Sequence, residues 1–156
     1  MEWAIFDGVP ADEVTRVLSI ARRRTFAAGE VVFHHDDPAD TMHLISRGRF
    51  AVRVRTSVGD TAILTVLGPG EIFGEVALLG PEQRRTATVE SLEAGETRSL
   101  LRGDLEALRR THPGVSDVLI AILVGEVKRL SGHLLEALYV PSDKRVLRRL
   151  VELAAV

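Results

Sequence analysis

The sequence predicts a mainly β domain flanked by helices, with one long helix toward its C-terminal end. Between Thr25 and Leu101, short runs of β-branched and aliphatic residues are separated by turns that contain glycine. Before and after this region, apolar residues recur every three or four positions, as they do in helices. Strands spaced this closely are typical of a sandwich, a barrel or a roll.

Length and composition indicate one globular domain and exclude several classes of protein. The chain has 156 residues, of which 46% are hydrophobic and 27% charged, so we expect a self-sufficient core. Its 20 basic and 22 acidic residues give a net charge of -2, so no overall charge attracts nucleic acid or a membrane. The absence of cysteine excludes disulfides, thiolate metal sites and a cysteine nucleophile. With no secretory signal in MEWAIFDGVP, we expect a cytoplasmic protein.

Three segments before the long helix have clear patterns. Helical spacing predicts a first helix over residues 10–21. In residues 49–55, arginines alternate with apolar residues, which predicts a strand with one buried face and one face in solvent. Residues 61–67 are apolar on both faces, which predicts a central strand.

A long helix is predicted beyond Pro113, ending near Tyr139. Its apolar residues at four- and three-residue steps have the a/d pattern of a coiled-coil seam: Leu123, Val127, Leu130, Leu134 and Ala137. A second apolar face lies near its start, at Val115, Val118, Leu119 and Ile122. Two faces predict two partners, the β region of the same chain and this helix in a second copy. The alternative is one wide stripe buried within a single subunit.

The end of the chain predicts a further element. Pro141 interrupts the helical pattern, and Ser142 and Asp143 can cap a new amphipathic helix. Nothing in the sequence follows to cover its apolar face, so we expect a C-terminal domain beyond Val156.

The segment GEIFGEVALLGPEQRRTATV has the features of a phosphate site. Gly74 permits a tight turn, after which the amides of Glu75, Val76 and Ala77 can begin a short helix and face an anion. Arg85 can then close over the anion with its planar fork. A carboxylate beside a phosphate needs another hydrogen-bond donor, such as a ribose hydroxyl, which favours a sugar phosphate or nucleotide. Taken alone, the same residues also fit a glycine turn with a surface ion pair.

The order of the whole chain resembles the cyclic-nucleotide-binding domain, specifically that of the Crp/Fnr superfamily of bacterial transcription regulators. The stretches that match are FGEVALLGPEQRRTATV, DTMHLISRGRFAVRV, AAGEVVF and VLRRLVELA. The resemblance implies a jelly-roll-like β-roll with an N-terminal helix over residues 1–112. It implies a dimerisation helix over residues 113–140. Residues 141–156 would then be a hinge and the first helix of a truncated winged helix-turn-helix domain.

The resemblance also implies a role for each residue of the phosphate-binding segment. Backbone groups of three residues would line the cyclic phosphate: Gly74, Val76 and Ala77. Glu75 would hold the ribose 2′-hydroxyl, and Arg85 would pair with the phosphate, with Arg84 as the alternative register. Thr86 would add its hydroxyl to the phosphate or the base.

The base contacts are less well defined. Leu130 and Ser131 fall where cAMP-dependent members place two hydroxyl residues that read the adenine, and leucine cannot make that hydrogen bond. A threonine directly after the arginine, as at Thr86, resembles the phosphate-binding segment of cGMP-binding kinases as well as that of bacterial cAMP receptors. We therefore expect cAMP, with cGMP, another cyclic nucleotide or no nucleotide as alternatives.

The predicted function is the effector-binding and dimerisation part of a Crp/Fnr-type regulator that signals to a C-terminal DNA-binding domain. Alternatives are a dimerisation domain with another ligand or none, and a cyclic-nucleotide module with a non-DNA output. We expect no enzyme activity, cofactor or metal, because no activated nucleophile accompanies Glu75 and Arg85. The sequence His34-His35-Asp36-Asp37 is interpreted as a turn, and His43 and His112 as packing and capping residues.

Overall fold

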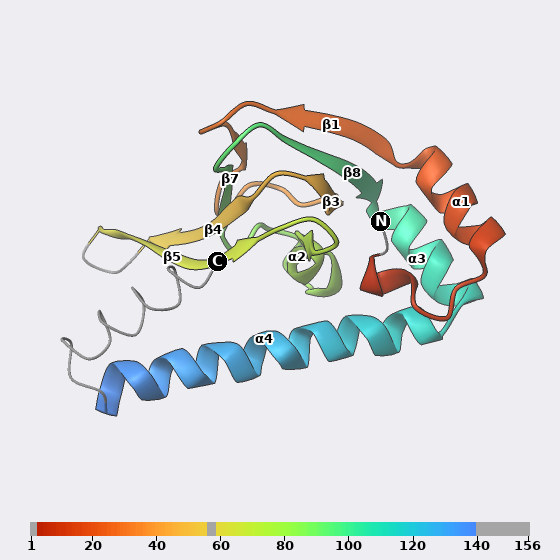
Figure 1. The fold of residues 1–156 in the computed structure, drawn as a ribbon. Coiled ribbons are helices and arrows are strands. Elements are labelled where there is room, and N and C mark those ends of the chain that lie inside the picture. Colours follow the sequence, from red (N-terminus) through yellow and green to blue (C-terminus); the bar gives the residue numbers. More distant parts are fainter. Residues whose placement is uncertain (1–2, 56–58, 140–156) are drawn as a thin grey trace. The chain divides into compact units, whose positions relative to one another are not determined.

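A computed structural model describes residues 3–55 and 59–139 of the chain (Figure 1). It confirms the mainly β architecture with flanking helices. The N-terminal helices are the 3-10 helix η1 (Ala4–Phe6) and α1 (Ala11–Ile20). The strands that follow are β1 (Arg22–Phe26), β2 (Val31–Phe33), β3 (Thr41–Arg47), β4 (Phe50–Arg55), β5 (Thr61–Leu67), β6 (Ile72–Phe73), β7 (Thr88–Ser91) and β8 (Gly95–Leu101). The short helix α2 (Glu75–Leu79) lies between β6 and β7, and α3 (Arg102–Thr111) and α4 (Gly114–Tyr139) follow β8.

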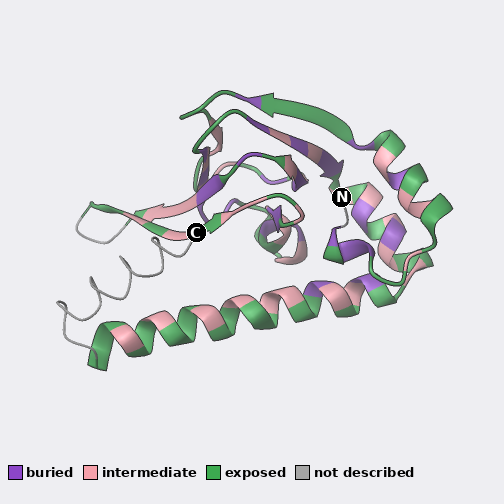
Figure 2. Cartoon of the chain, in the orientation of Figure 1, coloured by how far each residue is buried: buried purple, intermediate pink, exposed green. Residues whose placement is uncertain are grey.

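The strands form two four-stranded antiparallel sheets, in the orders β1-β8-β3-β6 and β2-β7-β4-β5. Both sheets contribute to one core cluster, which consists of Phe26, Ile45, Phe50, Phe73 and Val89. Figure 2 shows that β3 is mostly buried, whereas β1 is exposed along most of its length. This arrangement is the roll of strands that the closely spaced turns predict.

The position of β5 differs from the prediction of a central strand. Among the described strands β5 pairs with β4 alone, at the edge of its sheet. The side chains of Ile63 and Val66 are accordingly 53% and 44% exposed. A continuous apolar run indicates a strand that can be buried on both faces, but it does not determine which strands lie beside it.

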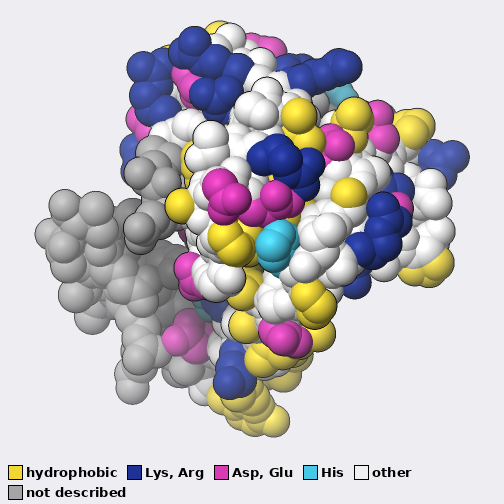
Figure 3. Space-filling view, turned by 90° about the vertical axis from the view of Figure 1, so that its right-hand side faces the viewer, with side chains coloured by type: hydrophobic (Ala, Val, Ile, Leu, Met, Phe, Trp, Pro, Cys, Tyr) yellow, Lys and Arg dark blue, Asp and Glu magenta, His cyan; other side chains and the backbone are white. Residues whose placement is uncertain are grey.

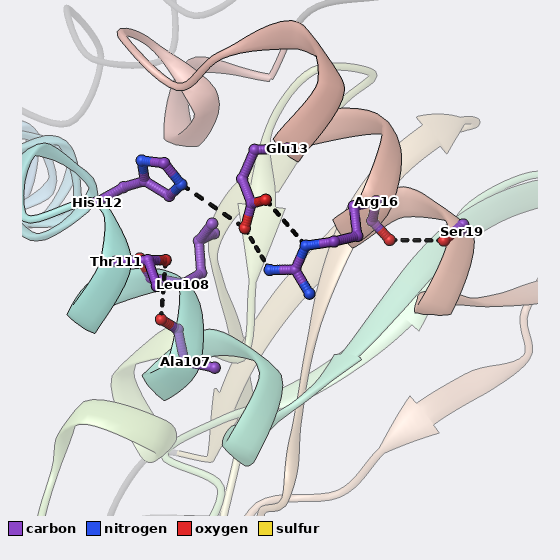
Figure 4. Close-up of polar contacts among 7 residues, drawn as sticks. All are labelled: Glu13, Arg16, Ser19, Ala107, Leu108, Thr111 and His112. Carbon is purple, nitrogen blue, oxygen red and sulfur yellow. Dashed lines mark hydrogen bonds and ion pairs between the residues drawn. The ribbon is translucent and has the colours of Figure 1, made fainter.

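Three residues connect α1 with the end of α3 (Figure 4). The Glu13 carboxylate accepts hydrogen bonds from Arg16 of the same helix, and these bonds hold the pKa of Glu13 below its usual value. Nε2 of His112 lies 3.6 Å from the Glu13 carboxylate. His112 is also the C-cap of α3, as its place before Pro113 predicts.

Basic side chains are prominent on one face of the molecule despite the net charge of -2. In the space-filling view, Lys and Arg side chains gather toward the top of the face shown (Figure 3). The strand β1 contributes three consecutive exposed arginines, Arg22, Arg23 and Arg24. One of them, Arg23, forms an ion pair with Glu96 of β8 at 2.5 Å.

The chain divides into two compact units, Met1–Ser116 and Asp117–Val156, and α4 crosses the boundary between them. Several seam positions of α4 are exposed, namely Val127 (62%), Leu130 (37%) and Leu134 (59%). Whether this stripe is buried within one subunit or pairs with a second copy stays a prediction. Within the described residues, α4 and the other helices lack the combination of length and apolarity that crossing a bilayer requires. The predicted hinge and the helix of residues 141–156 lie outside the described part of the chain.

Candidate ligand-binding site

The segment predicted to bind an anion forms β6, a left-handed turn and α2. Strand β6 pairs with His43 and Leu44 of β3, which places the turn at the end of a buried strand. Gly74 has a φ of 86°, a conformation that glycine adopts without steric cost. Helix α2 then begins at Glu75, as predicted, with Val76 43% exposed and Ala77 buried.

The backbone of Arg85 is held by the turn at residues 34–37. The N–H of Arg85 donates to the carbonyl of Asp37 (2.9 Å), and the N–H of Asp36 donates to the carbonyl of Arg85 (2.8 Å). The turn itself is closed by a hydrogen bond from the His34 N–H to Oδ2 of Asp37 (2.8 Å). The residues that look like a metal cluster in the sequence therefore form the expected turn, and this turn positions the arginine.

The guanidinium of Arg85 lies in the interior beside Gly74, and Arg85 is only 4% exposed. Its Nη1 donates to the carbonyl oxygen of Thr41 (2.7 Å), and its Nη2 donates to Oγ1 of Thr41 (2.8 Å). A longer bond joins Nη1 to the carbonyl of Gly74 (3.4 Å). The guanidinium carbon lies 4.0 Å from the centroid of the Phe33 ring, within cation–π range.

No carboxylate of the described residues forms an ion pair with Arg85. Its Nε is buried and has no hydrogen-bond acceptor there. Burial lowers the pKa of Arg85, while the charges of Asp40, Asp37 and Glu75 act in the opposite direction. A buried charged group without a direct counter-ion is costly, and an anion would satisfy both the charge and the Nε–H.

The neighbouring Arg84 points away from this site. Its Nη1 donates to the carbonyl of Asp36 (2.7 Å), and its side chain is 56% exposed. Successive residues in an extended segment point to opposite sides, which explains why two adjacent arginines have different surroundings. Of the two registers, the structure therefore places Arg85 beside Gly74.

Two other predicted site residues, Thr86 and Ser131, are exposed. Thr86 is exposed and lines a groove of about 500 Å³ on the β2-β7-β4-β5 sheet. The other residues that line it are His34, His35, Arg53, Val54, Arg55, Thr61, Thr88 and Glu90. Ser131 is exposed on α4, in the second unit. Contacts of Thr86 and Ser131 with a ligand stay predictions.

His43 packs beside the site. Its ring stacks on Phe73 at 4.8 Å between centroids, and its Nδ1 lies 3.0 Å from Oγ1 of Thr97. Burial, together with the charges of Arg85 and Arg24, lowers the pKa of His43 to about 3. The imidazole is thus neutral at pH 7, which agrees with the predicted packing role.

Sequence reasoning missed Thr41 and Phe33, which contact the guanidinium of Arg85 together with Gly74. Thr41 is 44 positions away from Arg85 and begins β3 as an ordinary β-branched residue. Phe33 ends β2 and looks like any other apolar strand residue. No local pattern marks either residue, because only the pairing of the strands brings them to Arg85.

The sequence was compared with protein families and with known proteins, and it matches a family over most of the β region. Residues 23–112 match the family described as "Cyclic nucleotide-binding domain". The chain is 33% identical over 124 residues to a cyclic AMP receptor protein of Thermus thermophilus, covering 80% of this chain and 57% of that protein. It is 25% identical over 150 residues to a CRP-like cAMP-activated global transcriptional regulator of Mycobacterium tuberculosis, covering 96% of this chain and 66% of that protein.

The fold agrees with these sequence relatives. The crystal structure of the Thermus thermophilus catabolite activator protein matches with a TM-score of 0.75 and 32% identity, covering 84% of this chain and 61% of that one. The chain thus spans about 60% of the length of the relatives named here. Because the family match extends over more than half of its residues, this chain belongs to the cyclic nucleotide-binding domain family and has Crp-type regulators among its relatives.

Proposed function

We propose that this chain is the effector-binding part of a Crp/Fnr-type transcription regulator and that its effector is cAMP. The observation that carries the proposal is the buried guanidinium of Arg85, which lies beside the Gly74 turn without an ion-pair partner among the described residues. A cyclic phosphate bears one negative charge and several acceptor oxygens. Bound at this place, it would neutralise Arg85 and accept the hydrogen bond of its Nε–H.

The residues around Arg85 have complementary roles in this proposal. Backbone groups of the turn and of α2, from Gly74, Val76 and Ala77, would line the phosphate. Glu75 is the first residue of α2 and would accept a hydrogen bond from the ribose 2′-hydroxyl. The carboxylate would then distinguish a nucleotide from a bare phosphate, which offers no such donor.

The choice of cAMP is supported by two relatives whose names include cyclic AMP, from Thermus thermophilus and Mycobacterium tuberculosis. Ser131 would read the base, because its hydroxyl can both donate and accept a hydrogen bond. Thr86 would add its hydroxyl to the phosphate or the base. cGMP is the competing ligand, since Leu130 next to Ser131 offers no hydrogen bond to the base.

Dimerisation and DNA output complete the proposal. The apolar side chains of Val127 and Leu134 on α4 are more than half exposed, which is costly unless another surface covers them. We propose that the predicted helix of residues 113–140 pairs with its counterpart in a second copy. DNA would be contacted only by a domain beyond residue 156, as the regulatory relatives suggest by their greater length.

Calorimetric titration with cAMP and cGMP tests the ligand. The expected result is saturable binding of cAMP by the wild-type chain and weaker binding of cGMP. Arg85→Ala should weaken cAMP binding by roughly 2 to 5 kcal/mol, because it removes a charge-assisted contact to a buried phosphate. Arg84→Ala is the matched control and should bind like wild type, because the Arg84 side chain is 56% exposed and donates to the carbonyl of Asp36 instead of entering the site.

Two outcomes would contradict the proposal. If neither nucleotide binds the wild-type chain, the effector is not a cyclic nucleotide of this kind. If both arginine variants lose affinity equally, the phosphate does not bind at Arg85.

A further inference from the structure

Thr41 holds Arg85 by two hydrogen bonds at once. Its backbone carbonyl accepts from Nη1 at 2.7 Å, and its side-chain Oγ1 accepts from Nη2 at 2.8 Å. The two terminal nitrogens of one guanidinium are therefore bound by the two oxygens of one residue. The Phe33 ring lies 4.0 Å from the guanidinium carbon and packs against the face of the group.

The contact with Thr41 leaves some N–H groups of the Arg85 guanidinium without a bond to Thr41. An arginine has five N–H donors in a fixed plane, and Thr41 engages two of them. The Nε–H has no acceptor among the described residues although it is buried. An anion bound by these remaining donors would leave both bonds to Thr41 intact.

From this geometry we infer that Thr41 is a positioning residue that sets the affinity of the site for its anionic ligand. The inference rests on the proposed function, since it concerns the arginine that would bind the cyclic phosphate. Thr41 fixes the plane of the guanidinium before ligand arrives. The arginine side chain then loses little conformational freedom on binding, and preorganisation of this kind increases affinity.

The alternative is that Thr41 competes with the ligand for Arg85. Competition would require the ligand to take the same two donors, whereas Nε–H already offers an unused one. Preorganisation and competition predict opposite effects of removing the hydroxyl. Loss of affinity supports positioning, and gain of affinity overturns it.

The test uses two variants that differ in one functional group. Thr41→Val removes Oγ1 and retains the β-branched shape, whereas Thr41→Ser retains the hydroxyl. In titrations with cAMP, we expect Thr41→Val to weaken binding about tenfold, which corresponds to about 1.4 kcal/mol. Thr41→Ser should stay within about threefold of wild type, a difference of about 0.6 kcal/mol.

A double-mutant cycle separates positioning from a general structural effect. If Thr41 acts through the guanidinium, Thr41→Val should change cAMP affinity little when Arg85 is already alanine. An equal loss in both backgrounds would mean that Thr41 supports the fold rather than the arginine, and would overturn the inference.

The Nε–H resonance of Arg85 gives a second readout that does not require ligand affinity. In wild type this buried N–H should exchange slowly with solvent, and Thr41→Val should accelerate the exchange, while Thr41→Ser should not. If wild type binds cAMP and Arg85→Ala does not, but Thr41→Val behaves like wild type, the inference fails and the proposed function stands. If wild type binds no nucleotide, the proposed function fails, and equal exchange rates in wild type and Thr41→Val would overturn the positioning role as well.

Discussion

Gly74 and Arg85 approach each other so closely that a side chain at position 74 would displace the guanidinium of Arg85. A Cβ built on Gly74 would lie 2.7 Å from Nη1 of Arg85 and 3.1 Å from the carbonyl oxygen of Thr41. The φ of 86° at Gly74 independently disfavours a side chain. The turn before α2 therefore requires glycine both for its backbone conformation and for the position of the arginine.

Gly74→Ala should weaken cAMP binding and also reduce the free energy of unfolding by about 1 to 2 kcal/mol, because an L-residue is strained at this φ. Urea denaturation and calorimetric titration measure the two effects. Gly103→Ala is the matched control, because a Cβ at Gly103 in α3 meets no atom within 4 Å. That variant should be neutral or slightly stabilising, since alanine favours a helix. Equal stabilities of the two variants would contradict this account of the turn.

Glu75→Ala should reduce the preference for cAMP over 2′-deoxy-cAMP, because the proposed partner of the carboxylate is the 2′-hydroxyl. The loss of affinity for cAMP should be smaller than that caused by Arg85→Ala. Competition binding with both nucleotides measures the preference. A variant that loses affinity for both ligands by the same factor would remove Glu75 from this role.

The lowered pKa of His43 predicts how the free energy of unfolding depends on pH. Its pKa is about 3 in the folded chain and near 6.5 when unfolded, so between these values the unfolded state binds more protons. The folded state therefore has its full stability with respect to His43 above about pH 6.5, and it loses this contribution as pH falls toward 3. His43 should contribute a slope of up to about 1.4 kcal/mol per pH unit in this range.

The matched variant for this prediction is His43→Gln, which retains a hydrogen-bonding group for Thr97 but cannot titrate. Urea denaturation between pH 7 and pH 4 should give a smaller decrease in its free energy of unfolding than in that of wild type. Parallel curves would show that another group causes the acid sensitivity.

The proposed dimer depends on exposed apolar residues of α4. Val127→Asp combined with Leu134→Asp should yield monomers, because each change would bury an unpaired charge in the interface. Light scattering at tens of micromolar measures the mass. The control is Lys128→Glu, at an exposed polar position next to Val127, and this variant should stay dimeric. A wild-type chain that is monomeric under these conditions would contradict the proposed seam.

Ligand should also affect α4 if Ser131 reads the base. We expect cAMP to slow hydrogen exchange of backbone amides at residues 74–87 and also at residues 126–139. Protection at residues 74–87 alone would show that nucleotide binds but that its base does not engage the helix. Leu130, in place of a hydroxyl residue, would then be the first position to change.

Local patterns in the sequence predicted the β region, the helices and the group formed by Gly74, Glu75 and Arg85. They succeeded because a glycine turn, a helix start and a nearby arginine are set by residues close together in the chain. The spacing of ten residues after Glu75 also favours Arg85 over Arg84, and Arg85 is the arginine that lies beside Gly74. The family assignment followed from the order of these segments.

Contacts between distant segments were decided by the tertiary structure alone. The edge position of β5, the placement of Thr86 in an outer groove and the two bonds from Arg85 to Thr41 all depend on which strands pair. Alternation along a strand indicates its buried face but not the identity of its neighbours. For the same reason the sequence by itself predicted an arginine close to the Gly74 turn, whereas the meeting of β2, β3 and the Arg85 segment decided how that arginine is held.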